Sequence, residues 1–343
     1  MSDVNTGKAI EQHGGNLSQI AARYPQAPKP FIDLSTGINP YAYPLPGIEP
    51  EWFHRLAECS EVAAAHNAAA KYYQAANPDT ITLAAGMQPL MFALASLRIK
   101  ECGGSKVSIL SPAYGEHERV WRAMGHKVAN VEALDNPAPG GVVIVCNPNN
   151  PDGRIIPPSR LIQLAETLAA HDGWLIVDES FADLMPEGSI AAAASESRNI
   201  IVLRSCGKFF GIAGLRVSTA IAPEPWAEWL RIAVGPWPVS TIACRLLPAM
   251  FSNEAWAKQM RTRLETEAAS WRPLLSQHFS LVGHMALFTL VETDNAAPWY
   301  DYLASQGVLV RRFDYNPRWL RFGLPAQAYL ARLQTTLAGY AKS

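Results

Sequence analysis

Short runs of consecutive apolar residues alternate along this chain with longer segments in which apolar residues recur at helical spacing. The runs that we interpret as strands cover residues 80–86, 106–112, 140–148, 174–180, 199–205 and 218–224. They are apolar throughout, which is typical of strands that are covered on both faces. Segments such as Met91–Ile99 and Ser159–His171 lie between them and have the spacing of amphipathic helices. This repetition predicts an α/β fold with a mostly parallel sheet.

The two ends of the chain follow a different pattern. The first 50 residues are rich in Gly, Pro and Asn, a composition that favours turns and extended segments over helices. An alanine-rich stretch from Glu61 to Ala76 predicts a helix. After residue 240, a helical region at 241–276 leads into three apolar segments that predict a small antiparallel sheet, at 279–293, 307–313 and 319–325.

These patterns divide the 343 residues into three expected parts. An N-terminal segment, residues 1–45, has no partner of its own and is expected to pack on the small domain and the active site. Residues 46–238 form a large α/β domain, and residues 239–343 form a small α+β domain.

Composition narrows the classes of function. Hydrophobic residues make up 49% of the chain and charged residues 17%, which allows a sizeable core. The net charge of -1 argues against a nucleic-acid partner, and no apolar run is long enough to span a membrane. Five cysteines without paired spacing, and no signal peptide, predict a cytoplasmic protein. The eight histidines form no metal-ligand pattern, so we expect no metal site.

The residues that follow the predicted strands are chemically distinctive. In an open parallel sheet, ligands bind at the carboxyl ends of the strands. Gly86, Met87 and Gln88 open a helix after the first strand, either as an anion site or as an ordinary turn. Tyr114 follows the second strand, where it either stacks on a flat ligand or packs in the core.

The next strands end in polar groups. The third is followed by "NPNNPDG", residues 147–153, a constrained turn whose Asn amides can donate to a ligand. The fourth ends at Asp178, either a helix N-cap or the counterion of a protonated ring nitrogen, because a buried carboxylate needs a cationic partner. After the fifth, Lys208 lies among apolar residues, which favours a nucleophilic amine. Ser205 and Arg216 flank it and suit a phosphate.

Together these residues indicate a pyridoxal phosphate (PLP) site. The run from Asn147 to Arg216 resembles fold-type-I PLP enzymes related to class I/II aminotransferases, which implies a fold-type-I PLP-dependent transferase fold and a homodimer. By that resemblance Lys208 forms the Schiff base and Asp178 pairs with the pyridine nitrogen. Asn150 contacts the 3′-oxygen of PLP, and Phe181 replaces a tyrosine that is common in aminotransferases. The implied cofactor residues are Gly86, Met87, Gln88, Tyr114, Asn150, Asp178, Phe181, Ser205, Lys208 and Arg216.

Other residues bear on the substrate. Arg321 matches the family arginine that binds the substrate carboxylate, and Arg311 is a candidate second anion site, with Arg312 as a competitor. The "HGGN" motif at 13–16, followed by "FIDLSTGINPYAYP" at 31–44, is similar to threonine-phosphate decarboxylases of cobalamin biosynthesis. That similarity implies decarboxylation of L-threonine O-3-phosphate to (R)-1-aminopropan-2-yl phosphate. The implied substrate residues are His13, Gly14, Gly37, Asn150, Arg311 and Arg321.

Two positions depart from that family, and two other functions stay open. Gly37 stands where some relatives have an asparagine, and Leu56 stands where relatives often have a tyrosine that reaches the partner subunit's cofactor. The main alternative is an aminotransferase acting on a phosphorylated amine such as histidinol phosphate. A non-catalytic scaffold is the second, which the intact set of Lys208, Asp178 and Arg216 disfavours.

Overall fold

The structure is a computed structural model that describes residues 14–135 and 137–340. The chain forms two compact units. The first combines the N-terminal part as far as Tyr41 with residues 151–153 and with the chain from Gln259 onward. The second contains residues 42–150 and 154–258.

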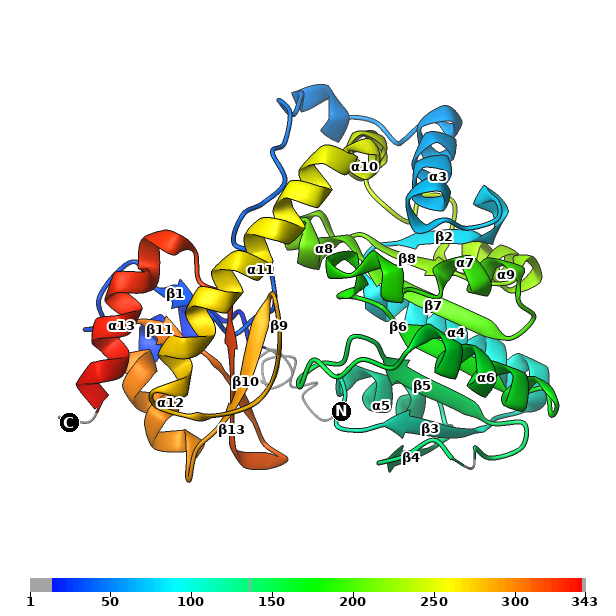
Figure 1. The fold of residues 1–343 in the computed structure, drawn as a ribbon. Helices are drawn as coiled ribbons and strands as arrows, with labels where there is room; N and C mark the ends of the chain where they lie inside the picture. The colour runs from blue at the N-terminus through cyan, green and yellow to red at the C-terminus, as the bar shows by residue number, and fades with distance from the viewer. Residues whose placement is uncertain (1–13, 136, 341–343) are drawn as a thin grey trace, which may run out of the picture. The chain divides into compact units, whose positions relative to one another are not determined.

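A seven-stranded sheet organises the second unit, in the order β2-β8-β7-β6-β5-β3-β4 (Figure 1). Its strands are β2 (Ile81–Ala84), β3 (Lys106–Leu110), β4 (Lys127–Val131), β5 (Val142–Cys146), β6 (Trp174–Asp178), β7 (Ile200–Ser205) and β8 (Ser218–Ile221). All pairs are parallel except the two that β8 makes, with β2 and β7. The mostly parallel sheet is therefore confirmed. Strand β4 was not predicted, because its sequence is half polar and its residues are largely exposed.

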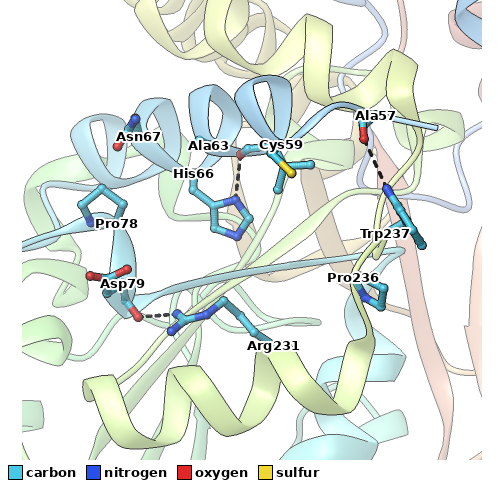
Figure 2. Close-up of a pocket in the computed structure, with 11 residues that line it drawn as sticks. Ala57, Cys59, Ala63, His66, Asn67, Pro78, Asp79, Arg231, Pro236 and Trp237 are labelled. Atoms are coloured by element: carbon cyan, nitrogen blue, oxygen red, sulfur yellow. Dashed lines mark hydrogen bonds between the residues drawn. The ribbon is translucent and has the colours of Figure 1, made fainter. Parts of the chain in front are cut away.

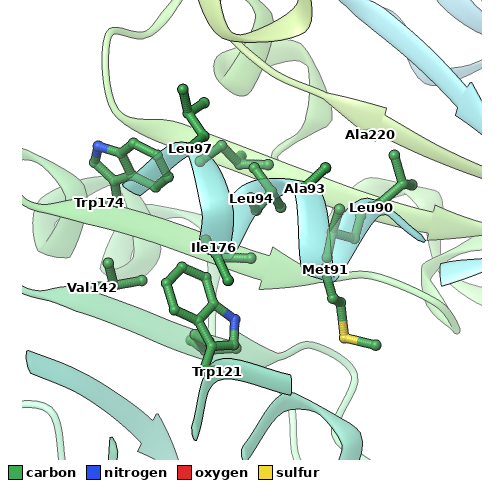
Figure 3. Packing of buried hydrophobic residues seen from close by; sticks show 14 of the residues in the cluster. Leu90, Met91, Ala93, Leu94, Leu97, Trp121, Val142, Trp174, Ile176 and Ala220 are labelled. Carbon is green, nitrogen blue, oxygen red and sulfur yellow. The ribbon is translucent and has the colours of Figure 1, made fainter. Parts of the chain in front are cut away.

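Helices cover both faces of this sheet. They are α3 (Cys59–Tyr73), α4 (Met87–Cys102), α5 (Glu116–Ala123), α6 (Pro158–Ala169), α7 (Ala191–Glu196), α8 (Cys206–Phe209), α9 (Glu224–Val234) and α10 (Thr241–Ser252). Helices α4, α5 and α9 enclose one core with the sheet, in which Leu94, Trp121 and Trp174 are buried (Figure 3). Helices α6 and α7 pack against β6 and β7 from the other face.

One strand direction matters for the site. Because β8 runs against its neighbours, it begins at the edge where the other strands end. Ser218, its first residue, lies opposite both Ala84 of β2 and Ser205 of β7. Arg216, two residues before β8, is therefore brought to the carboxyl edge of the sheet.

The first unit contains a four-stranded antiparallel sheet in the order β12-β13-β10-β9, which confirms the predicted small sheet. The strands are β9 (Ser280–Met285), β10 (Phe288–Glu292), β12 (Arg311–Phe313) and β13 (Asn316–Gly323). Helices α12 (Ala296–Ser305) and α13 (Leu330–Gly339) belong to the same unit. The predicted helical region at 241–276 is present as two helices, α10 and α11 (Glu254–Ser276), which Asn253 separates. The Asn253 side chain accepts a hydrogen bond from the amide of Trp256.

The N-terminal segment does have a pairing partner. Helix α2 (Leu17–Arg23) is followed by β1 (Ile32–Asp33), which pairs in parallel with β11 (Val308–Leu309). Two-residue strands give no periodic signal, so the sequence did not predict this pair. Among the described residues, none of the helices has an apolar stretch long enough to cross a membrane.

Candidate active site

Asp178 is the buried end of β6 and is held by two neighbours. His117 of α5 hydrogen-bonds to its carboxylate, with Nε2 and Oδ2 2.8 Å apart. The amide and hydroxyl of Ser180 donate to Oδ1, at 3.0 and 2.5 Å. Burial alone would raise the pKa of Asp178, but the His117 and Ser180 contacts outweigh it and lower that pKa below its usual value. The carboxylate is therefore ionised.

His117 carries the matching charge. Burial alone would lower its pKa, but its contacts with Asp178 and Cys146 raise the pKa to about 10. Sequence reasoning missed this residue. The sequence offered one signal, because His117 follows the predicted stacking residue Tyr114 by three positions. In the structure the two rings meet edge to face, with centroids 6.1 Å apart. Among the described residues, His117, Cys146 and Asp178 also form a trio of metal-ligand type, and the His117–Asp178 hydrogen bond accounts for two of its members.

Side-chain amides hold the turn after β5. Asn147 bonds to both the carbonyl and the amide of Ile156, at 3.1 and 2.8 Å. Asn149 donates to the carbonyl of Pro112, at 2.8 Å. These bonds fix the backbone on the amino side of Asn150, a half-buried residue at the edge of the unit. The constrained turn expected from its two prolines and three asparagines is thereby explained.

Gly86 and Arg216 meet at the carboxyl edge. Gly86 caps helix α4 with a φ of 98°, and a Cβ at this position would collide with the Arg216 guanidinium. Arg216 itself has a φ of 55°, in the left-handed region that non-glycine residues rarely occupy. Met87 and Gln88 form the first turn of α4, whose free amides favour an anion. Four of the five predicted phosphate residues, Gly86, Met87, Gln88 and Arg216, therefore lie around one helix N-terminus, and Gln88 also donates to Glu116.

Lys208 lies in α8, one turn beyond Ser205 at the end of β7. Its Nζ is 5.8 Å from the centroid of the buried Phe181 ring. A Cβ on Gly207 would come within 3.0 Å of the Cα of Ala213, so the loop after Lys208 packs closely against the residue before it. Lys208 is thus half-buried, lies beside the Phe181 ring and belongs to a closely packed turn.

Two arginines face each other in the first unit. Arg311 of β12 and Arg321 of β13 are directly opposite in the antiparallel register. Burial, and then the charge of Arg311, lower the pKa of Arg321 to about 10. Arg312 lies over the ring of Tyr300 instead, 5.1 Å from its centroid. The register therefore favours Arg311 over Arg312 as the neighbour of Arg321.

Ser35 connects the Gly14-Gly15 pair to Arg321 by hydrogen bonds. Gly14 and Gly15 have φ values of 74° and 81°. The Gly15 amide donates to Ser35 Oγ at 2.7 Å, and a Cβ on Gly14 would lie 2.7 Å from that atom. Arg321 donates to the Ser35 carbonyl at 3.0 Å. Ser35 was not among the predicted residues, and it links the glycine loop to Arg321.

The predicted residues divide between the two units. Gly14, Gly37, Arg311 and Arg321 belong to the first unit, and Gly37 is buried there. His13 lies outside the described residues. The predicted PLP residues, Asn150 included, belong to the second unit.

A separate cavity of about 390 Å³ opens elsewhere in the second unit. Figure 2 shows His66, Arg231 and Trp237 among its lining residues, with Arg231 donating to the Asp79 carbonyl and Trp237 to the Ala57 carbonyl. Nδ1 of His66 lies 2.9 Å from the Val62 carbonyl. None of the predicted site residues that the structure describes lines this cavity.

The profile described as aminotransferase class I and II matches residues 49–337. Over 334 residues the chain is 40% identical to a threonine-phosphate decarboxylase of a Sinorhizobium species, covering 95% of this chain and 97% of that protein. It is 37% identical to the threonine-phosphate decarboxylase of Pseudomonas aeruginosa, covering 96% and 98%.

A solved structure shares the fold at lower identity. The histidinol-phosphate aminotransferase of Sinorhizobium meliloti, determined in complex with pyridoxal-5′-phosphate, superposes with a TM-score of 0.77 at 16% identity, covering 100% of this chain and 98% of that one. The fold-type-I expectation is confirmed. The chain therefore belongs to the aminotransferase class I and II family and, within it, to the threonine-phosphate decarboxylases.

Proposed function

We propose that this protein is a PLP-dependent lyase that converts L-threonine O-3-phosphate to (R)-1-aminopropan-2-yl phosphate and CO₂ in cobalamin biosynthesis. Its relatives of that name match over nearly the whole of both chains. The single structural observation that carries the proposal is the facing pair Arg311 and Arg321, tied through Ser35 to the Gly14-Gly15 loop. A substrate with both a carboxylate and a phosphate has two anionic groups that arginine side chains bind well.

The residues of the second unit fit PLP. The ionised Asp178 is an acceptor for a protonated pyridine nitrogen, and the Gly86 turn with Arg216 and Ser205 is a cradle for a phosphate. Tyr114 would stack on the flat ring, and Asn150 would donate to its 3′-oxygen. When bound, PLP supplies the electron sink for the electron pair left at Cα as CO₂ departs.

The roles of the chain's own groups follow from their positions. Asp178, kept ionised by His117, holds a proton on the ring nitrogen. Lys208 would hold the cofactor, and its free amine would then be the group that delivers a proton to Cα of the substrate. The Phe181 ring beside Lys208 Nζ would shield this amine from water.

The arginine pair determines which substrate is accepted. Arg321 binds the carboxylate that leaves as CO₂, and Arg311, with His13 and the amides at Gly14, binds the phosphate. Gly37, where some relatives have an asparagine, would lie near the substrate without a side-chain contact to it. A substrate without the phosphate lacks the group that Arg311 would bind, so we expect it to be used much less efficiently.

A histidinol-phosphate aminotransferase is the second candidate, because it would use the same cofactor residues. The N-terminal motif and the full-length relatives favour the decarboxylase. An intact Lys208, Asp178 and Arg216 disfavour a non-catalytic scaffold.

We also propose a cytoplasmic homodimer. Large apolar side chains are exposed on the second unit near residues 45–56 and 232–237, among them Phe53 (70%), Leu56 (61%) and Trp237 (53%). Exposed apolar clusters of this kind mark protein contacts. Leu56 would then pack across the interface at the position where relatives use a tyrosine. All five cysteines are free thiols, which fits a reducing compartment.

The reaction itself is the first test. The protein with PLP and O-phospho-L-threonine, and no keto-acid acceptor, should release CO₂ and form aminopropanyl phosphate in equal amounts. Both products are measured, by trapped CO₂ and by ³¹P NMR. Turnover that requires an added keto acid and releases no CO₂ would establish the aminotransferase instead.

The glycine loop gives a second prediction. Gly14→Ala should raise the KM for phosphothreonine about tenfold or more, because a side chain at positive φ costs roughly 1–2 kcal/mol and meets Ser35. The affinity for PLP should stay at the wild-type value. Gly47→Ala is the control, since no atom lies within 4 Å of the added Cβ. A wild-type KM in Gly14→Ala would remove the loop from the substrate site.

The Asp178–His117 pair gives a pH prediction. A histidine whose pKa is raised stabilises the fold fully below its ordinary pKa, about 6.5, and loses that contribution as the pH rises through its folded value, about 10. The free-energy difference of unfolding between cofactor-free wild type and His117→Leu should therefore shrink from pH 7 to 10. Burial lowers the pKa of His66, so His66→Leu should show a constant difference over this range. Parallel curves for the two variants would contradict the charged pair.

A further inference from the structure

A second cluster of buried charges, formed by Arg204, Glu179 and Asp183, lies near the carboxyl edge of the large sheet. Arg204, the penultimate residue of β7, donates to Glu179 (Nη1 to Oε2, 2.7 Å) and to Asp183. The three side chains are 3%, 0% and 1% exposed. Asp178 pairs with Leu203 in the sheet, so alternation directs Glu179 and Arg204 to the face opposite Asp178.

Other contacts complete the cluster. The Glu179 carboxylate also accepts hydrogen bonds from the Ser189 hydroxyl at 2.5 Å and the Ile190 amide at 2.8 Å. The Arg204 guanidinium lies 4.7 Å from the centroid of the Tyr73 ring. Charges buried this deeply are retained only when such contacts compensate for their lost hydration.

The three charged residues belong to the segments that carry the reactive groups. Glu179 directly follows Asp178. Arg204 directly precedes Ser205, after which the turn that carries Lys208 begins. Asp183 lies two residues after Phe181, whose ring is beside Lys208 Nζ. The planar guanidinium bonds to two carboxylates at once, so it fixes the exit of β6, the turn after it and the exit of β7 against one another.

Another buried arginine shows what a purely structural role looks like. Arg98 of α4 is 4% exposed and donates to the carbonyls of Gly140 and Asp172, at 2.6 and 3.0 Å. Those carbonyls lie just before β5 and β6, at the opposite edge of the same sheet. Arg98 therefore matches Arg204 in burial and hydrogen bonding but not in its distance from the reactive groups.

We propose that Arg204, through Glu179 and Asp183, is a positioning residue that sets the placement of Asp178, Phe181 and Lys208 for the cofactor. This inference rests on the proposed PLP site and extends it to a residue that contacts neither cofactor nor substrate.

Arg204→Lys tests the proposal, because lysine keeps the charge but cannot bond to both carboxylates in the same plane. We expect PLP to bind about tenfold more weakly. We also expect a shift in the pH midpoint at which the visible absorbance of the bound cofactor changes. Ser189→Ala, which removes one bond to Glu179, should move both quantities in the same direction by less. Arg98→Lys should lower the thermal midpoint and leave both at wild-type values.

Two results would overturn the proposal. One is wild-type PLP affinity and pH midpoint in both Arg204→Lys and Ser189→Ala. The other is an equal change of both quantities in Arg98→Lys, which would show that loss of stability alone causes the effect. If the proposed reaction is wrong, wild-type protein will bind PLP but release no CO₂ from phosphothreonine. In that case PLP affinity and the pH midpoint still decide the role of Arg204.

Discussion

The burial of the Asp178 carboxylate is the constraint on which the cofactor half of the site depends. An unpaired charge at the end of an interior strand costs several kcal/mol, so it persists only where a cation and hydrogen-bond donors meet it. His117 and Ser180 meet it here. The consequence is a carboxylate that stays ionised in a dry environment, which is the condition for keeping a ring nitrogen protonated.

The sheet brings the other groups to this carboxylate. Parallel strands end at one edge, and the reversed β8 returns the chain to that edge, so Arg216 reaches Gly86 although 130 residues separate them. Strand pairing also brings charged side chains together in the first unit. There an antiparallel register places two arginines face to face, an arrangement that favours a ligand with two anionic groups.

Much of this could be predicted from the sequence where the signal is local. Continuous apolar runs predicted six strands of the large sheet correctly, and the residues after them are the basis of the predicted cofactor site. The misses have physical causes. Strand β4 is partly polar because it is the edge strand and only Val128 of its five residues is buried. Strands β1 and β11 are too short to show a period. The break between α10 and α11 leaves no mark in the apolar pattern, because the Asn253 side chain is the acceptor for the Trp256 amide at the start of α11.

The missed site residues share one property, which is that their roles exist only through long-range contacts. His117 matters because β6 brings Asp178 to it, and Ser35 because Arg321 of β13 donates to its carbonyl. Arg204 is one more charged residue in the sequence until Glu179 and Asp183 surround it. That the predicted cofactor residues and the predicted substrate residues act in one reaction is a prediction from the sequence motifs.

The central claim is that Arg311 and Arg321 select a phosphorylated amino acid. The direct measurement is kcat/KM for CO₂ release from O-phospho-L-threonine and from L-threonine, in wild type and in Arg311→Met. We predict a preference of roughly 10⁴ for the phosphorylated substrate in wild type, most of which Arg311→Met loses while its bound-cofactor spectrum is unchanged. Comparable rates on both substrates in wild type, or an unchanged preference in Arg311→Met, would contradict the account.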